Sequence, residues 1–98
     1  MNTTVEVKTK KLVVSSEVDG YSYREYEVSS MEAAEYFMTF DLPEDWMTTA
    51  TRDEGEVKYE RVEDMSSDDY CVIVTTRYGI EVTYYMGRDC SIEFYRIA

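Results

Sequence analysis

Histidine is absent from the 98-residue chain, and proline, glycine and cysteine are scarce. Without histidine, the chain lacks the commonest general base, the Ser/His and Cys/His nucleophile pairs, and most zinc and iron ligand sets. The four glycines, Gly20, Gly55, Gly79 and Gly87, each stand alone, so there is no glycine-rich phosphate loop. The sequence therefore predicts no catalytic residues, no cofactor and no metal centre, and it indicates a protein that is not an enzyme.

Calcium is the metal that an acidic chain could still bind, but the spacing of an EF-hand loop is not met. With Gly20 at the sixth loop position, the twelfth position is Tyr26, and with Gly55 it is Arg61, where a bidentate acid is required. A further acidic group consists of Asp64, Asp68 and Asp69. It could hold a cation weakly at the surface, or it could simply be a solvated turn.

Cysteine and long apolar runs are too few for a secreted or membrane-spanning domain. Cys71 and Cys90 cannot form the disulfide framework of a small secreted protein, and residues 1–25 contain neither a signal-like nor a membrane-spanning stretch. A chain of this length supports one hydrophobic core. We therefore expect a single domain over residues 1–98, located in the cytoplasm.

Negative charge is what the chain has in excess. It carries 21 acidic and 10 basic residues, for a net charge of −11. Such a charge repels nucleic acid and anionic membranes, and it attracts basic surfaces, including proteins that hold nucleic acid. The expected partner is a basic protein, with no direct nucleic-acid binding and no membrane association.

Strand-like runs separated by turn residues predict two hairpins. Asp19-Gly20 and Glu54-Gly55 are the turn signals, the first being a strong one for a two-residue hairpin. The runs that flank them are rich in Val, Thr and aromatic residues. They cover residues 4–16, 21–28, 46–52 and 57–62.

One short helix is expected over residues 30–40. Ser29 and Glu32 have the spacing of a capping box, and Pro43 disfavours helical geometry at the preceding residue. Apolar residues recur at helical spacing and predict a face that packs in the core. The members of this face are Ala33, Ala34, Phe37, Met38 and Phe40.

The last third of the chain predicts a three-stranded meander over residues 70–77, 80–86 and 90–97. With turns at residues 78–79 and 87–89, alternation places one apolar row on the core side: Cys71, Ile73, Thr75, Val82, Tyr84, Met86, Cys90, Ile92 and Phe94. The solvent side then holds Glu81, Thr83, Tyr85, Ser91, Glu93 and Tyr95. The two cysteines would lie two strand spacings apart, about 9.6 Å, too far for a disulfide. We therefore expect both to be reduced and buried as small hydrophobes, and the less favoured alternative is a redox pair.

These elements together predict an α+β fold: a mostly antiparallel, twisted sheet of six or seven strands with one short helix packed on it. Ten tyrosines, many of them in or beside predicted strands, fit either core packing or a binding surface, since tyrosine is enriched both in strands and at interface hot spots.

Acidic residues are densest between residues 41 and 69, a stretch that contains eleven acidic and three basic residues. Acids at every second strand residue recur about every 6.8 Å, close to two nucleotide steps of about 3.4 Å. The acids could therefore copy a phosphate row, or simply keep the chain soluble. We predict the partner-binding residues here: Asp53, Glu54, Glu56, Tyr59, Glu60, Glu63, Asp64, Asp68, Asp69 and Tyr70.

By size and composition, and without a shared motif, the chain resembles the small acidic phage-encoded inhibitors of bacterial defence nucleases, of the anti-CRISPR or anti-restriction type. The resemblance implies stoichiometric inhibition, in the host-cell cytoplasm, by occupying the basic nucleic-acid channel of an enzyme. Two other classes stay open. One is a small structural or assembly module that oligomerises, for example as a homodimer, through a strand edge. The other is an enzyme or ligand carrier, which would need a deep pocket with convergent polar groups.

Overall fold

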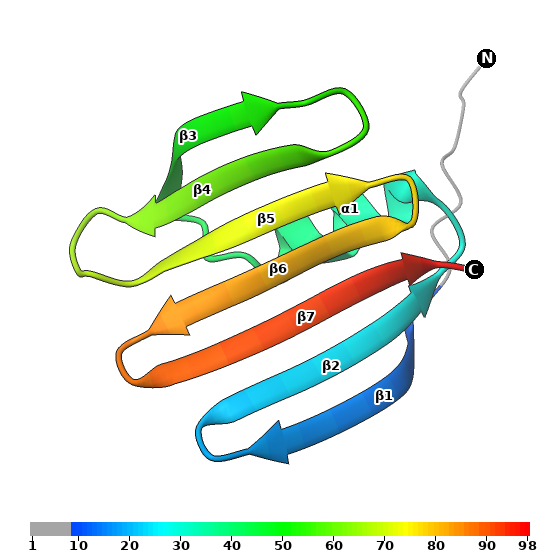
Figure 1. The fold of residues 1–98 in the computed structure, drawn as a ribbon, viewed down its shortest axis with the longest axis horizontal. Coiled ribbons are helices and arrows are strands. Elements are labelled where there is room, and N and C mark those ends of the chain that lie inside the picture. Colours follow the sequence, from blue (N-terminus) through cyan, green and yellow to red (C-terminus); the bar gives the residue numbers. More distant parts are fainter. Residues whose placement is uncertain (1–8) are drawn as a thin grey trace.

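A seven-stranded sheet with one helix against one of its faces makes up residues 9–98, the part of the chain that the computed structural model describes (Figure 1). The elements follow one another as β1 (Lys11–Val18), β2 (Tyr21–Val28), α1 (Met31–Asp41), β3 (Trp46–Asp53), β4 (Lys58–Asp64), β5 (Tyr70–Thr76), β6 (Gly79–Met86) and β7 (Asp89–Ile97). The predicted α+β class and strand number are confirmed. Residues 4–8 of the first predicted strand lie outside the described residues.

The strand order is β1-β2-β7-β6-β5-β4-β3, and β2–β7 is the one parallel pair among the described strands. From β3 to β7 the chain runs as an antiparallel meander. A parallel pair needs a crossover connection, and here α1 together with the meander returns the chain to β2. The edges of the sheet are therefore β1 and β3.

The Asp19-Gly20 turn forms as predicted. Both residues have positive φ, 45° at Asp19 and 82° at Gly20, which is what a two-residue type I′ hairpin requires.

Packing requires glycine at position 79. The φ of Gly79 is 147°, and a Cβ there would overlap the backbone carbonyl of Tyr95 on β7.

The helix begins one residue later than the capping box predicted. Ser30, not Ser29, is the N-cap: it has extended backbone angles, and its Oγ accepts a hydrogen bond from Ala33 N at 3.2 Å. The helix ends at Asp41, and Leu42 is extended ahead of Pro43, as expected of a residue before proline.

The core lies between α1 and the sheet face that it covers. Ala33 and Ala34 are fully buried, and their small side chains allow the helix to lie close to β6, β7 and β2. The buried strand residues are Val28, Val62, Cys71, Ile73, Ile80, Val82, Tyr84 and Tyr95. Partly buried side chains close the rim of this core: Tyr26, Met31, Phe37, Met38, Leu42, Trp46 and Ile97.

The predicted register of the meander is wrong at both of its turns. Between β5 and β6 the register differs by two residues, since Cys71 pairs with Tyr84 rather than with Met86. Because side chains alternate with a period of two, this shift leaves the predicted faces of both strands unchanged. Between β6 and β7 it differs by one residue, because the turn is Gly87-Arg88 and Met86 pairs with Asp89. A slip of one residue exchanges the two faces of a strand.

As a result, β7 presents the opposite face to the core. Tyr95, predicted on the solvent side, is completely buried beneath α1. Ile92 and Phe94, predicted in the core, lie half-buried on the sheet face that α1 does not cover. Both faces of β7 carry large apolar side chains, so alternation alone did not identify the buried one.

The same exchange separates the cysteines. Cys71 is buried on the α1 side, whereas Cys90 is half-buried on the other face, and both are free thiols. The predicted row that placed them on either side of Met86 is therefore not formed.

Candidate functional site

The acids predicted to bind a partner are distributed over both ends of β4. Asp53, Glu54 and Glu56 lie at the β3–β4 connection, and the group at residues 64–69 lies at the β4–β5 connection (Figure 1). Between them, Glu60 pairs with Ile73 and shares the α1 side of the sheet, whereas Glu63 pairs with Tyr70 and shares the opposite side. High density in sequence thus does not produce one continuous acidic surface.

Several of these acids also have partners within the chain. Each of three pairs joins a basic and an acidic side chain two residues apart, namely Arg52–Glu54 at 3.2 Å, Lys58–Glu60 at 3.7 Å and Arg61–Glu63 at 3.3 Å. Such exposed pairs are worth only about 0 to 1 kcal/mol. They nevertheless reduce the field that these three carboxylates present to a partner.

Asp64 and Asp69 hold backbone turns. Asp64 Oδ1 accepts hydrogen bonds from Ser66 N at 2.9 Å and Ser66 Oγ at 2.7 Å, and Oδ2 accepts from Ser67 Oγ at 2.8 Å. These bonds, led by the backbone one, lower the pKa of Asp64. Asp69 Oδ1 accepts from Gly87 N at 3.2 Å, which ties this turn to the β6–β7 turn.

The acids of residues 64–69 are accordingly not arranged around a common point. Among residues 9–98 no group of three or more Asp, Glu, Cys or His side chains is placed to hold a metal ion. The α1 helix, with 11 residues, is too short and too polar to span a membrane, and no other described helix could do so.

Tyr59 and Tyr70, the predicted aromatic anchors, both lie on the sheet face that α1 leaves open. Each is covered by a guanidinium from its own chain: Arg52 lies 4.6 Å from the ring centroid of Tyr59, and Arg61 lies 3.8 Å from that of Tyr70. Tyr70 also stacks on Tyr85, with centroids 4.8 Å apart. A partner would therefore meet arginine–tyrosine stacks here rather than bare rings.

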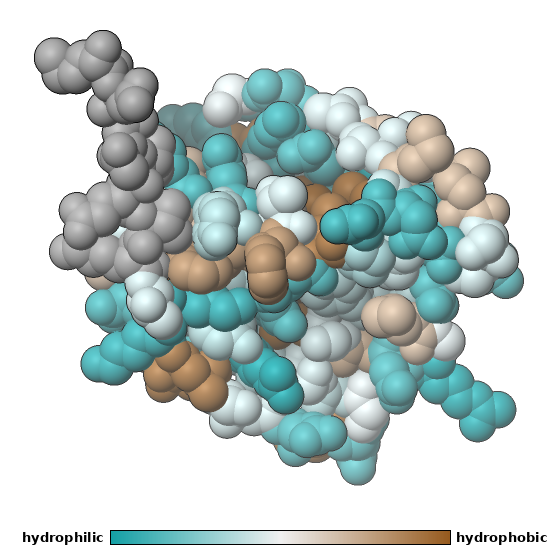
Figure 2. Space-filling view, turned by 180° about the vertical axis from the view of Figure 1, so that it is seen from behind, coloured by the Kyte–Doolittle hydropathy of each residue, from teal (hydrophilic) through white to brown (hydrophobic). Residues whose placement is uncertain are grey.

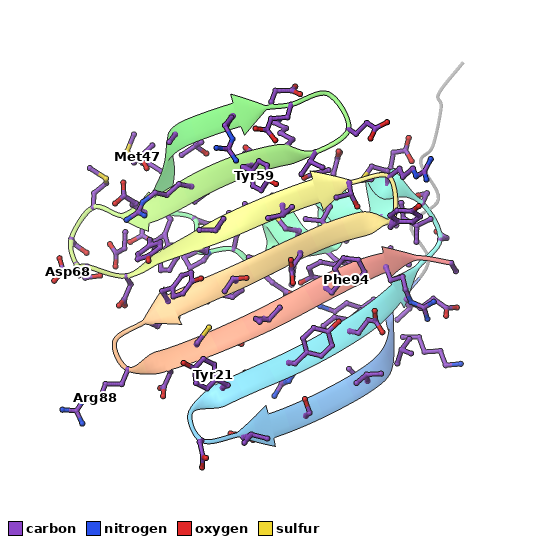
Figure 3. All side chains as sticks on the ribbon, viewed as in Figure 1. Tyr21, Met47, Tyr59, Asp68, Arg88 and Phe94 are labelled. Carbon is purple, nitrogen blue, oxygen red and sulfur yellow. The ribbon has the colours of Figure 1, made fainter. Side chains whose placement is uncertain are left out.

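The rest of this open face mixes aromatic and apolar side chains with charged ones, among them Arg96 paired with Glu25 and Glu27. Figure 3 shows Tyr21, Tyr59 and Phe94 on the side of the sheet turned away from α1. Tyr21 is 64% exposed, whereas Phe94 is half-buried by its neighbours on the sheet. No described helix covers this face.

A second surface, missed from the sequence, lies on the outer side of α1 and the turn after it. We call it the helix hollow, a depression of about 920 Å³ lined by Glu32, Glu35, Tyr36, Thr39, Phe40, Leu42 and Glu44. Three of these residues are carboxylates and none is basic. Figure 2 shows this side of the molecule, with hydrophobic residues set between hydrophilic ones.

Phe40, predicted in the core, is 77% exposed in the helix hollow. The buried stripe of α1 is centred between Ala33 and Ala34, and at about 100° per residue Phe40 lies roughly 70° from that centre. Its ring stacks on Tyr36, with centroids 6.3 Å apart, and Tyr36 is 52% exposed. The spacing of Tyr36 and Phe40, four residues apart beside outward-facing glutamates, is the signal that could have revealed this surface.

A smaller hollow of about 530 Å³ brings together two of the predicted acids. Asp53 and Glu56 line it with Lys58, next to the Arg77-Tyr78 turn. Its lining includes both a lysine and an arginine, so its charge is mixed, in contrast to the helix hollow.

Comparisons of the chain with protein-family models, curated proteins and solved structures gave no match.

Proposed function

We propose that the protein is a non-enzymatic, acidic binding protein that docks on a basic, nucleic-acid-binding surface of a partner protein and inhibits it stoichiometrically. In this role it acts as a nucleic-acid mimic of the anti-CRISPR type. The observation that carries the proposal is the helix hollow, in which Tyr36 and Phe40 are exposed among three carboxylates with no basic side chain in the lining.

Each part of this surface has a physical role in such docking. Exposed carboxylates steer a basic partner and make association sensitive to salt. An aromatic pair supplies apolar area that becomes buried, and tyrosine is enriched among the residues that dominate binding energy. Because Phe40 is 77% exposed, most of its apolar surface is not buried by folding. Burial of this surface by a partner would therefore add to the binding free energy. The acidic hairpin residues predicted from the sequence remain a second contact region in this proposal.

Affinity capture from a candidate host lysate, with mass spectrometry of the retained proteins, tests the proposal. We expect basic nucleic-acid-binding proteins to be retained, and to be released both by raised salt and by added nucleic acid. Retention of acidic or neutral proteins only, or binding that neither salt nor nucleic acid weakens, would contradict it.

Three double charge reversals then locate the contact. E35K/E44K changes the helix hollow, E54K/E56K changes the β3–β4 connection, and E17K/D89K changes two exposed acids outside both regions. All three alter the net charge equally. If the helix hollow is the contact, E35K/E44K weakens capture most; equal loss in all three variants would mean that the charge acts without a specific surface.

One observation favours the alternative of assembly through a strand edge. The edge strand β1 exposes apolar side chains, with Leu12 at 50%, Val14 at 43% and Val18 at 66% exposure. Both edge strands, however, contain register shifts, between Leu12 and Val14 in β1 and between Thr48 and Ala50 in β3. Such bulges hinder edge-to-edge pairing. Analytical ultracentrifugation at high protein concentration decides: a dimer that V14K dissociates supports assembly through β1, and a monomer excludes it.

A further inference from the structure

The ammonium group of Lys10 lies in a cage of three aromatic rings. Its Nζ is 4.4 Å from the ring centroid of Tyr26, 5.3 Å from that of Tyr95 and 5.5 Å from that of Phe37. A carboxylate completes the cage, since Asp41 Oδ2 lies 2.6 Å from the same nitrogen. All three rings are within the distance of about 6 Å at which a cation is attracted to a ring face.

Contacts within the fold hold the walls of this cage in place. Tyr95 is fully buried and stacks on Tyr26 with ring centroids 5.6 Å apart. The Tyr95 hydroxyl lies 2.7 Å from Asp41 Oδ2 and 2.8 Å from Glu93 Oε2. Burial, together with the hydrogen bond to Asp41, raises the pKa of Tyr95, so its hydroxyl stays neutral and able to donate.

The charge of the cluster also favours a cation. Two carboxylates, Asp41 and Glu93, converge on the Tyr95 hydroxyl, and Lys10 forms an ion pair with Asp41. Lys10, Asp41 and Glu93 together carry a net charge of −1, so the cluster is negative even with the lysine in place. Without Lys10, the Asp41 carboxylate and three ring faces would remain around the position of its ammonium group, with Glu93 on the Tyr95 hydroxyl.

Lys10 and the cage come from different parts of the fold. The rings and acids belong to β2, α1 and β7, whereas Lys10 precedes β1, outside any strand or helix. Tyr26, Tyr95 and Asp41 are also joined by contacts that do not involve the lysine. The Lys10 side chain is 24% exposed, so its place can be reached from solvent.

We propose that this cage is a binding site for an alkylammonium group, and that Lys10 is a tethered occupant which an external ligand can displace. A lysine side chain of a partner and a small quaternary ammonium ion share this chemistry. Ring faces suit a quaternary ammonium, whereas Asp41 offers the hydrogen bond that a primary ammonium needs. The inference goes beyond the proposed docking function, and it stands whether or not the helix hollow binds a partner.

The direct test is to titrate the K10A variant with tetramethylammonium chloride and to follow the Tyr26, Phe37 and Tyr95 ring signals by NMR. A sodium chloride titration at equal ionic strength controls for salt. We expect saturable shifts of these three rings with a dissociation constant of about millimolar, and weaker binding in K10A/D41N. A second titration uses N-acetyl-lysine methylamide, which carries the primary ammonium of a lysine side chain. The ligand with the lower dissociation constant shows whether the cage prefers a lysine side chain or a quaternary ammonium ion.

A measurement on the unchanged protein keeps the proposal testable if K10A does not fold. Ring currents shift the Lys10 ε-methylene signals upfield while the lysine occupies the cage, and displacement by either ligand should return them toward their free values. Ring signals in K10A that respond only as they do to sodium chloride would overturn the proposal and leave Lys10 as a structural contact. The same conclusion would follow if K10A is unfolded and neither ligand displaces Lys10 from the parent.

Discussion

Individual side chains in this protein differ sharply in chemistry according to the sheet face that they occupy. Cys71 lies on the α1 side of the sheet with no exposed surface, and this burial raises the pKa of its thiol to about 11. Cys90, on the open face, is half-buried. The thiolate is the reactive form of cysteine, so the two residues should react at different rates.

We predict that iodoacetamide at pH 8 modifies Cys90 of the native protein well before Cys71. At that pH the Cys71 thiol is almost entirely protonated, and the reagent must also wait for the fold to open. Peptide mass spectrometry over time measures both rates, and unfolding in urea should make them similar. Equal rates in the native protein would show that Cys71 is not buried as the structure places it.

The aromatic residues differ in the same way. We predict that F40A changes the free energy of unfolding by less than about 0.5 kcal/mol, because Phe40 is mostly in solvent. The matched control is I80A, at a residue only 1% exposed, which should cost about 2 to 5 kcal/mol. Urea unfolding measures both variants. A large loss for F40A would mean that its ring packs in the core after all, as its helical spacing suggested.

At the scale of elements, the two serines before α1 provide a direct test of where the helix begins. Ser30 accepts the hydrogen bond from Ala33 N, whereas Ser29 is exposed. We predict that S30A destabilises the fold by about 1 kcal/mol, the usual loss for an N-cap, and that S29A has little effect. Thermal unfolding of both variants decides. A greater loss in S29A would restore the cap position that the sequence spacing indicated.

Elements could be predicted from the sequence far better than their pairing. Turn residues and apolar periodicity located α1 and the described strands, because these signals act within a few residues of the chain. The β6–β7 register changes by one residue according to whether the turn has two residues or three. Tyr95 and Phe94 have similar apolar area, so burying either of them in the core is similarly favourable. Neither this competition nor the parallel pairing of β2 with β7 has a local sequence signal.

The candidate sites show the same limit. The acids of residues 41–69 are close in sequence, but the strand between them separates them in space and their own arginines and lysines pair with several. The helix hollow is formed by residues 32–44 alone, so its helical spacing is visible in the sequence, whereas the Lys10 cage gathers residues that are far apart in the sequence. The cage joins Lys10, Tyr26, Phe37, Asp41 and Tyr95, and no sequence spacing connects Lys10, Tyr26 and Tyr95 with one another or with the two α1 residues.

At the scale of the whole molecule, the net charge of −11 should limit stability when salt is low. The radius of gyration is 14.0 Å, shorter than the screening length of about 30 Å at 0.01 M salt and longer than the value of about 10 Å at 0.1 M. Each carboxylate therefore feels charges across the molecule at the lower salt but only nearby charges at the higher. Salt also weakens the local ion pairs, but exposed pairs contribute only about 0 to 1 kcal/mol each.

We predict that the melting temperature rises when sodium chloride is increased from 0.01 M to 0.1 M, because screening relieves more repulsion between acids than it removes attraction in ion pairs. The E35K/E44K variant, less negative by four charges, should show a smaller rise. Scanning calorimetry of both proteins at both salt concentrations measures the effect. A melting temperature that falls with salt in the parent would mean that local pairs such as Arg61–Glu63 and Lys10–Asp41 outweigh the excess of negative charge in the folded state.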